Sequence, residues 1–210
     1  MEIHIVKRTL LLLSAAALAT AAPLHAQLSK NSGFVGNLHL NGSSITLTGD
    51  DNETEAGGGV GLMLGYGFNE NITLFFNFDF AQAEYANEDD DIAGDGNFDL
   101  AHGDLGLRVN FGSTASRVRP FVIAAFTGIV EADEGEDDLG NEVEAQITGG
   151  GLTVGGGVQY FFSRRFALDA GLSVTSGSLT AIAIDDEDED LPVGLGVVSS
   201  RLQLGVSWHP

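Results

Sequence analysis

Apolar and polar residues alternate along most of this chain, and a period of two residues is typical of β-strands with two different faces. In residues 57–68, for example, Val60, Leu62 and Leu64 share one face, whereas Gly61 belongs to the other. The alternation predicts eight strands, at residues 33–48, 57–68, 72–86, 98–111, 119–130, 145–162, 166–184 and 197–209.

The same alternation predicts the register of two hairpins. If the turn after the second strand centres on Glu70, Tyr66 faces Leu74 and apolar residues meet along the whole hairpin. The hairpin between the sixth and seventh strands keeps the same parity, with Val154 opposite Val174. A slip of one residue would move an entire face to the other side of the sheet, so this matching supports both pairings.

The predicted connections differ in length and in charge. The chain has 30 acidic residues and 9 Lys and Arg, a formal net charge of -21, and the four long connections hold 23 of the acidic residues without any Lys or Arg. Such a chain lacks the basic surface that nucleic acid requires, which excludes nucleic-acid binding. The short connections are 69–71, 112–118 and 163–165, and the long ones are 49–56, 87–97, 131–144 and 185–196.

The apolar face is expected to meet lipid. A soluble β-sandwich or lipocalin-like barrel would turn its polar face to water, and that face would carry many Lys and Glu residues. Here the polar face has few charges and many short side chains, which favours the packed interior of a narrow membrane barrel. Aromatic residues beside the short connections are predicted to form a girdle at the membrane surface: Phe34, Phe68, Phe111, Phe121, Phe162, Phe166 and Trp208.

Residues 1–26 are predicted to be a cleaved secretory signal peptide, and residues 27–210 the barrel domain. Lys7 and Arg8 precede a run of apolar and small residues at 9–22, and Ala26 offers a cleavage position. This run is shorter than the roughly 20 residues that a membrane-spanning helix needs. There are no cysteines, which excludes disulfides and thiol chemistry.

These features together resemble the OmpA-like outer-membrane β-barrel superfamily, and the end of the chain, RLQLGVSW at 201–208, fits the resemblance. The resemblance covers the whole of residues 27–210 and rests on patterns rather than on fixed residues. It implies an all-β, eight-stranded antiparallel up-and-down transmembrane barrel in the bacterial outer membrane, with short periplasmic turns and long acidic outer loops. Outer-membrane lipid and the barrel-assembly machinery, which would recognise Trp208, are the implied partners. Closure leaves no sheet edge, which predicts a monomer.

Polar residues on the inward face are predicted to form a network in the lumen. If the connection between the third and fourth strands centres near Ile92, Asp79 lies level with Asp104 or near it, and Arg108 or Arg201 could neutralise them. A proton or ion relay and a salt-bridged plug are both compatible with this arrangement, and the plug is favoured because buried charges are normally paired. The predicted network comprises His39, Asp79, His102, Asp104, Arg108, Asp169 and Arg201.

The long acidic connections have two possible roles. They could bind divalent cations such as calcium loosely, although the spacing does not match an EF-hand, or they could be solvated segments that repel one another. No other cofactor is expected. The candidate cation ligands are Asp89, Asp91, Asp95, Asp185, Asp186 and Asp188.

Three functions are compatible with these patterns. The first is a structural or interaction role, in which a plugged barrel displays its outer loops to an unknown surface partner. The second is a narrow cation-preferring porin or a small-molecule transport protein. The third is a lipid-modifying barrel enzyme, for which His39 and the nearby Ser43 lack any framing motif. The sequence favours the first function and predicts no catalysis.

Overall fold

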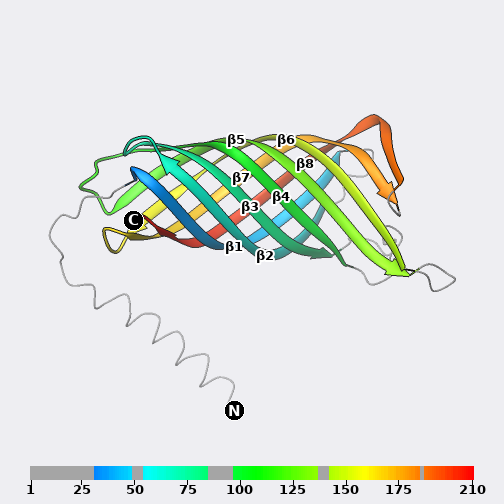
Figure 1. Ribbon diagram of the computed structural model, residues 1–210, viewed down its shortest axis with the longest axis horizontal. Coiled ribbons are helices and arrows are strands. Elements are labelled where there is room, and N and C mark those ends of the chain that lie inside the picture. Colours follow the sequence, from blue (N-terminus) through cyan, green and yellow to red (C-terminus); the bar gives the residue numbers. More distant parts are fainter. Residues whose placement is uncertain (1–30, 49–53, 85–96, 137–141, 185–186) are drawn as a thin grey trace, which may run out of the picture.

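Each strand of the computed structural model pairs with its neighbours in sequence, and the first strand closes on the last to form an antiparallel barrel (Figure 1). The structure describes residues 31–48, 54–84, 97–136, 142–184 and 187–210. The predicted signal peptide, residues 1–26, lies outside them. Among the described residues, no helix is long and apolar enough to cross a membrane. The strands are β1 (Gly33–Thr48), β2 (Thr54–Gly67), β3 (Ile72–Glu84), β4 (Asn97–Asn110), β5 (Val118–Glu136), β6 (Glu142–Phe161), β7 (Phe166–Ile184) and β8 (Glu187–Trp208).

The two predicted hairpin registers are confirmed, and a third is shifted by a few residues. Tyr66 pairs with Leu74, and Val154 pairs with Val174. Between β3 and β4, Asp79 lies near Asp104 as expected, but its direct partner is His102. Alternation fixes which residues share a face, whereas the offset between two strands depends on the stagger that closes the barrel.

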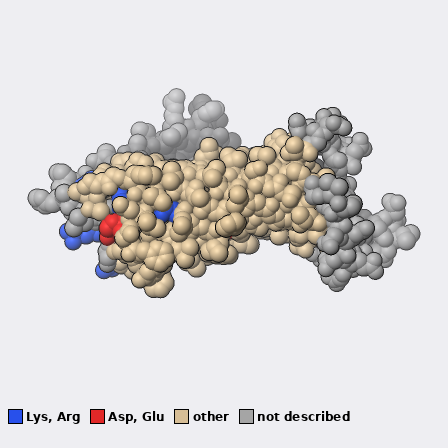
Figure 2. Space-filling model, turned by 90° about the horizontal axis from the view of Figure 1, so that it is seen from above, with Lys and Arg blue, Asp and Glu red and all other residues tan. Residues whose placement is uncertain are grey.

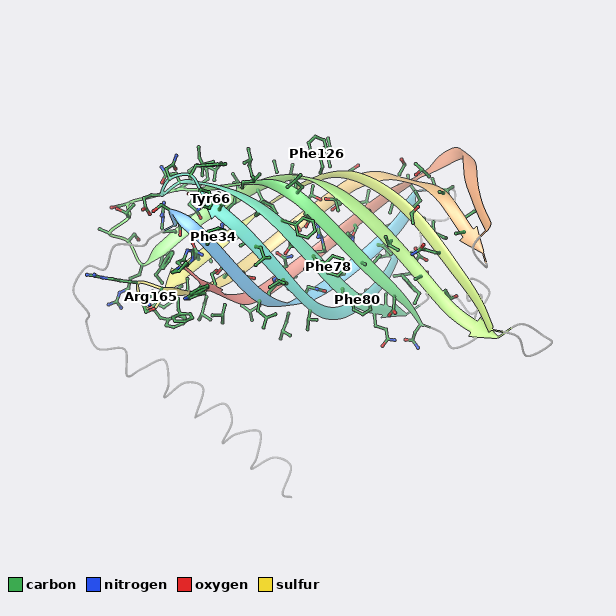
Figure 3. All side chains as sticks on the ribbon, viewed as in Figure 1. Phe34, Tyr66, Phe78, Phe80, Phe126 and Arg165 are labelled. Atoms are coloured by element: carbon green, nitrogen blue, oxygen red, sulfur yellow. The ribbon has the colours of Figure 1, made fainter. Side chains whose placement is uncertain are left out.

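The barrel carries its apolar residues outside and its polar residues inside. Phe34, Leu38 and Leu40 are 71%, 67% and 64% exposed, whereas Arg201 is only 1% exposed. Figure 3 shows the labelled side chain of Phe126 pointing away from the barrel. A soluble protein buries its large apolar residues, so this inverted arrangement requires a lipid environment around the barrel.

Aromatic side chains surround the end of the barrel that carries the short connections, which is called the turn end here. The outer face at this end exposes Phe34, Phe68, Phe111, Phe162, Phe166 and Trp208, and Tyr66 joins them through an edge contact with Phe34 at 5.4 Å. In Figure 2 the charged side chains visible on the described surface gather towards this end, beyond an uncharged band. Phe121 is absent from this group because its side chain is buried inside the barrel.

At the opposite end, called the rim end, two hairpins extend further than the sequence predicts. Strand β5 pairs with β4 only up to Ala132 but continues beside β6 to Glu136. Strand β8 begins at Glu187 beside β7, whereas its pairing with β1 begins at Gly196. The expectation that 131–144 and 185–196 are entirely loops is therefore wrong, because backbone pairing with one neighbour continues these strands beyond the closed sheet.

Because the outer face meets lipid, a charge placed on it should cost more in the middle of the apolar band than at its edge. We expect Leu40→Arg to lower the free energy of unfolding by about 2–4 kcal/mol. Thr48→Arg, at the rim end of the same strand, should cost about 0–1 kcal/mol. Urea unfolding in lipid vesicles, followed by the fluorescence of the single Trp, would measure both. Equal costs for the two variants would contradict a lipid-facing band.

Candidate functional site

The lumen is built in layers along the barrel axis. Near the rim end, inward side chains from six strands form an apolar cluster, the rim cluster: Ile45, Ala83, Phe98, Leu100, Ile129, Leu179 and Val197. Closer to the turn end lies a second apolar cluster of Val35, Met63, Phe75 and Ala125. Asp79 of β3, Asp104 of β4 and Arg201 of β8 lie between these two clusters, so this polar layer is shielded from water along the axis.

Arg201 is the centre of the polar layer. Its guanidinium donates to Asp79 Oδ2 at 2.8 Å and to both carboxylate oxygens of Asp104, at 2.7 and 2.9 Å. All three side chains are at most 3% exposed. A bidentate pair of this kind is among the strongest hydrogen-bonded contacts in proteins, and here one cation binds two buried carboxylates from different strands.

Asp79 is surrounded by further hydrogen-bonding groups. His39 Nε2 lies 2.5 Å from its Oδ1, and the side-chain amides of Asn77 and Gln203 donate to its Oδ2 at 2.8 and 2.9 Å. Strand β2 contributes Gly61, where a Cβ would collide with both Asp79 and His39. The glycine therefore provides the space in which this histidine meets the carboxylate.

Three threonines extend the cluster across the remaining strands. Thr127 of β5 donates to Asp104 Oδ1 at 2.7 Å, and its hydroxyl also meets Thr153 of β6. Thr153 in turn bonds Thr175 of β7 at 2.6 Å. Hydroxyl groups can donate and accept at once, so this chain satisfies the carboxylate without adding charge.

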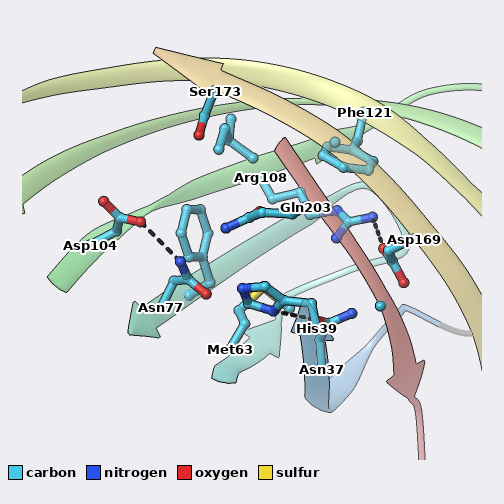
Figure 4. Close-up of a pocket in the computed structure, with 14 residues that line it drawn as sticks. Asn37, His39, Met63, Asn77, Asp104, Arg108, Phe121, Asp169, Ser173 and Gln203 are labelled. Atoms are coloured by element: carbon cyan, nitrogen blue, oxygen red, sulfur yellow. Dashed lines mark hydrogen bonds and ion pairs between the residues drawn. The ribbon is translucent and has the colours of Figure 1, made fainter. Parts of the chain in front are cut away.

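A second cluster of charges lies towards the turn end. Arg108 Nη2 donates to Asp169 Oδ1 at 2.8 Å, and its guanidinium carbon lies 3.6 Å from the centre of the Phe121 ring (Figure 4). The prediction that Phe121 belongs to the outer girdle is therefore wrong, since its side chain faces the lumen and is 8% exposed. Both faces of β5 are apolar, so alternation alone could not assign its inward side.

Glycines on the neighbouring strands make room for the Phe121 ring. Gly157 of β6 is the register partner of Phe121, and Gly171 of β7 is in turn the partner of Gly157. A Cβ on Gly157 would lie 2.7 Å from Phe121 Cζ, and one on Gly171 would lie 3.4 Å from it. The Phe121 ring can therefore lie flat over the next two strands, because neither has a side chain at that height.

A cavity of about 40 Å³ lies between these groups and is lined by residues of both charge clusters, including His39, Asp104, Arg108 and Asp169. At roughly 10–15 Å³ of such volume per water, it has room for about three waters. A smaller cavity of about 10 Å³ lies at the turn end beside Asn31 and His209.

The turn end is closed by residues next to the strands. Asn31 donates its backbone NH to Glu70 at 2.9 Å and is buried at the mouth of the lumen. His209, which follows β8, packs on the Phe161 ring at 5.2 Å between ring centres. Burial lowers the pKa of His209 to about 4, so its imidazole is neutral at pH 7.

The structure brings the predicted network residues together in two groups and not in one. His39, Asp79, Asp104 and Arg201 form the central cluster, with His102 nearby on Ser199 at 2.9 Å. Arg108 binds Asp169 and not the aspartate pair.

The candidate cation ligands Asp89, Asp91, Asp95, Asp185 and Asp186 lie outside the described residues, and the side chain of Asp188 is not described. Within the part of the chain that the structure describes, no group of three His, Cys, Asp or Glu residues could hold a metal ion.

Several members of the clusters were not predicted. Thr127, Thr153 and Thr175 are neutral residues that sequence analysis did not single out, although each occupies an inward position of its strand. Arg119, the first residue of the predicted fifth strand, faces the lumen and donates to Asn71 Oδ1 at 3.0 Å. Inward parity combined with a polar side chain is the signal that would have found all four.

Comparisons with known proteins agree with this architecture. A family described as "Outer membrane protein beta-barrel domain" matches residues 9–209. No curated protein matches the sequence. Among solved structures, Neisserial surface protein A is 20% identical with a TM-score of 0.56, and the match covers 84% of this chain and 97% of that one.

Two further solved structures have the same fold. The attachment invasion locus protein Ail of Yersinia pestis is 16% identical, with 84% and 98% of the two chains covered and a TM-score of 0.52. OprG of Pseudomonas aeruginosa is 15% identical, with 87% and 98% covered and a TM-score of 0.57. Identities this low establish a shared fold and nothing about activity.

Removing the central cation should destabilise the barrel strongly. We expect Arg201→Leu to lower the free energy of unfolding by about 3–5 kcal/mol, because Asp79 and Asp104 would be left buried without their guanidinium. Arg165→Leu, in an exposed turn, is the matched control and should change stability by less than about 0.5 kcal/mol. Urea unfolding in lipid vesicles measures both, and an Arg201→Leu protein as stable as the control would refute this account.

The space next to Phe121 gives a second prediction. Gly157→Ala should destabilise the barrel by about 1–3 kcal/mol, because the added methyl group overlaps the aromatic ring and the neighbouring backbone. Gly103→Ala is the control, since a Cβ there meets nothing within 4 Å. Thermal unfolding of the two variants in the same detergent measures the difference, and a Gly157→Ala protein as stable as the Gly103→Ala control would contradict this packing.

Proposed function

Because this chain belongs to the outer membrane protein beta-barrel domain family, we propose that it is a sealed barrel that anchors acidic hairpins at the bacterial cell surface. The outer membrane supplies the lipid that its apolar face requires. The turn end then faces the periplasm and the rim end faces outwards, as short and long connections do in such barrels. The proposed role is structural or interactive, without catalysis and without transport through the lumen.

The filled cross-section of the lumen carries this proposal. Arg201, from β8, reaches across to β3 and β4 and binds a carboxylate on each. An eight-stranded barrel is just wide enough for its own side chains, so a paired guanidinium at the centre occupies the path that a solute would need. The rim cluster adds an apolar layer that an ion would have to cross without hydration.

The projecting hairpins support the display role. The segments 131–144 and 185–196 contain eight and six acidic residues and no Lys or Arg. Beyond Ala132 the β5–β6 pair, and before Gly196 the β7–β8 pair, continue outside the closed sheet. A concentrated negative charge on these projections attracts cations and basic surfaces and repels acidic ones. The partner is therefore expected to be cationic.

Two relatives in structure carry names that refer to a surface or to attachment, namely Neisserial surface protein A and the attachment invasion locus protein. Those names describe those proteins. They are compatible with a surface role for this chain, to which the acidic hairpins give a specific chemistry.

A narrow cation-preferring pore is the second candidate function. It is favoured by the inward carboxylate of Glu131 at the rim end, which is 8% exposed and faces the lumen above the rim cluster. Carboxylates at a pore mouth select cations. This candidate requires that the rim cluster and the Arg201 pairs open, and both are closed in the structure.

Planar-bilayer conductance of the refolded protein, with and without millimolar calcium, separates the two functions. We expect no steady conductance from the wild-type protein in either condition. Arg201→Ala keeps the apolar rim cluster and should also carry no steady current. Steady cation-selective current through the wild-type protein, blocked by calcium, would overturn the sealed barrel and identify a small porin.

A further inference from the structure

Both ring nitrogens of the buried His39 have hydrogen-bonding partners. Nδ1 lies 2.8 Å from Asn37 Oδ1, and Nε2 lies 2.5 Å from Asp79 Oδ1. Gly61 and Gly205 pair with His39 on its two sides, and a Cβ on either would collide with its side chain. A neutral imidazole has one donor and one acceptor nitrogen, so these partners determine its protonation state.

The partner of Nδ1 is an acceptor. The carboxylate of Asp169 is paired with Arg108 and can only accept, so the hydroxyl of Ser207 donates its one hydrogen to Asp169. The Ser207 oxygen then accepts from the side-chain nitrogen of Asn37 at 3.3 Å. This direction turns Asn37 Oδ1 towards His39, and Nδ1 must carry a hydrogen to bond it.

The partner of Nε2 is also an acceptor. Oδ2 of Asp79 receives hydrogen bonds from Asn77, Arg201 and Gln203 at 2.8–2.9 Å. Several donors on one carboxylate favour its ionised form. An ionised carboxylate has no hydrogen to offer, so Nε2 of His39 must donate as well.

The charge balance of the central cluster leads to the same result. Asp79 and Asp104 supply two carboxylates, and Arg201 supplies one guanidinium group. An unbalanced charge among these side chains is strongly unfavourable, because the apolar clusters shield them from water. A protonated His39 imidazole makes the central cluster neutral, and the turn-end pair of Arg108 and Asp169 is balanced on its own.

We propose that His39 and Asp79 form a buried proton-binding site, in which the His39 ring is held as an imidazolium with a hydrogen on each nitrogen. The imidazolium bonds the central cluster directly through Asp79. It also reaches the turn-end cluster through Asn37 and Ser207, so a single proton joins the two groups of charges. This site does not depend on whether the lumen conducts.

The protonation state can be read directly by NMR of the refolded protein labelled with ¹⁵N-histidine, in lipid bilayers at pH 7. We expect two protonated ring nitrogens, each with a one-bond coupling to hydrogen, for His39. His209 is the internal reference with a single protonated nitrogen, because burial lowers its pKa to about 4. His39→Gln and His102→Gln assign the signals. A non-protonated Nε2 in His39 would overturn the proposal.

The dependence of His39 protonation on the Asp79 carboxylate provides a second test. In Asp79→Asn the ring no longer faces an anion, and we expect the His39 signal to change to that of an imidazole with one hydrogen. Ser199→Ala is the control, since Ser199 contacts His102 and its loss should leave the His39 signal unchanged. If Asp79→Asn fails to fold, the wild-type spectrum alone decides. A folded Asp79→Asn protein that keeps both hydrogens on His39 would contradict the site.

Discussion

The pairing of two buried carboxylates with the guanidinium of Arg201 is the constraint on which the rest of the lumen depends. Surrounded by lipid outside and by apolar clusters above and below, Asp79 and Asp104 have no access to bulk water and need partners within the barrel. The surrounding histidine, amides and threonines complete their hydrogen bonds. Each strand is therefore positioned by the group that it contributes to this layer, as well as by its backbone ladder.

Sequence alternation predicted the architecture well because the two faces of a lipid-embedded barrel differ so strongly in polarity. The hairpins around Glu70 and Arg164 followed from matching apolar partners. Where polarity was uninformative, prediction failed: β5 is apolar on both faces, so Phe121 was assigned outwards. The Arg108–Asp169 pair depends on the register between strands distant in sequence, which alternation does not determine. At the rim end, the strands continue through acidic segments whose composition had suggested loops.

The abundance of glycine, 29 residues in the chain, has a specific role in this interior. A narrow barrel can hold a bulky inward side chain where the adjacent strands leave room beside it. Gly61 and Gly205 are the two cross-strand partners of His39, and Gly157 and Gly171 lie beside the Phe121 ring on the next two strands. Each large inward group is thus accommodated by glycines on neighbouring strands.

Closure of β1 on β8 has a consequence for how the barrel forms. It brings Asn37 and Ser207 into contact across 170 residues of chain, and Arg201 meets Asp79 across 122. Contacts so distant in sequence form late and slowly. Until the last strand docks, the aspartates of β3 and β4 lack the cation that neutralises them, so a partly assembled sheet gains little stability from its interior. Folding of this barrel should therefore be close to all-or-none, with the arrival of the final strand as the committing step.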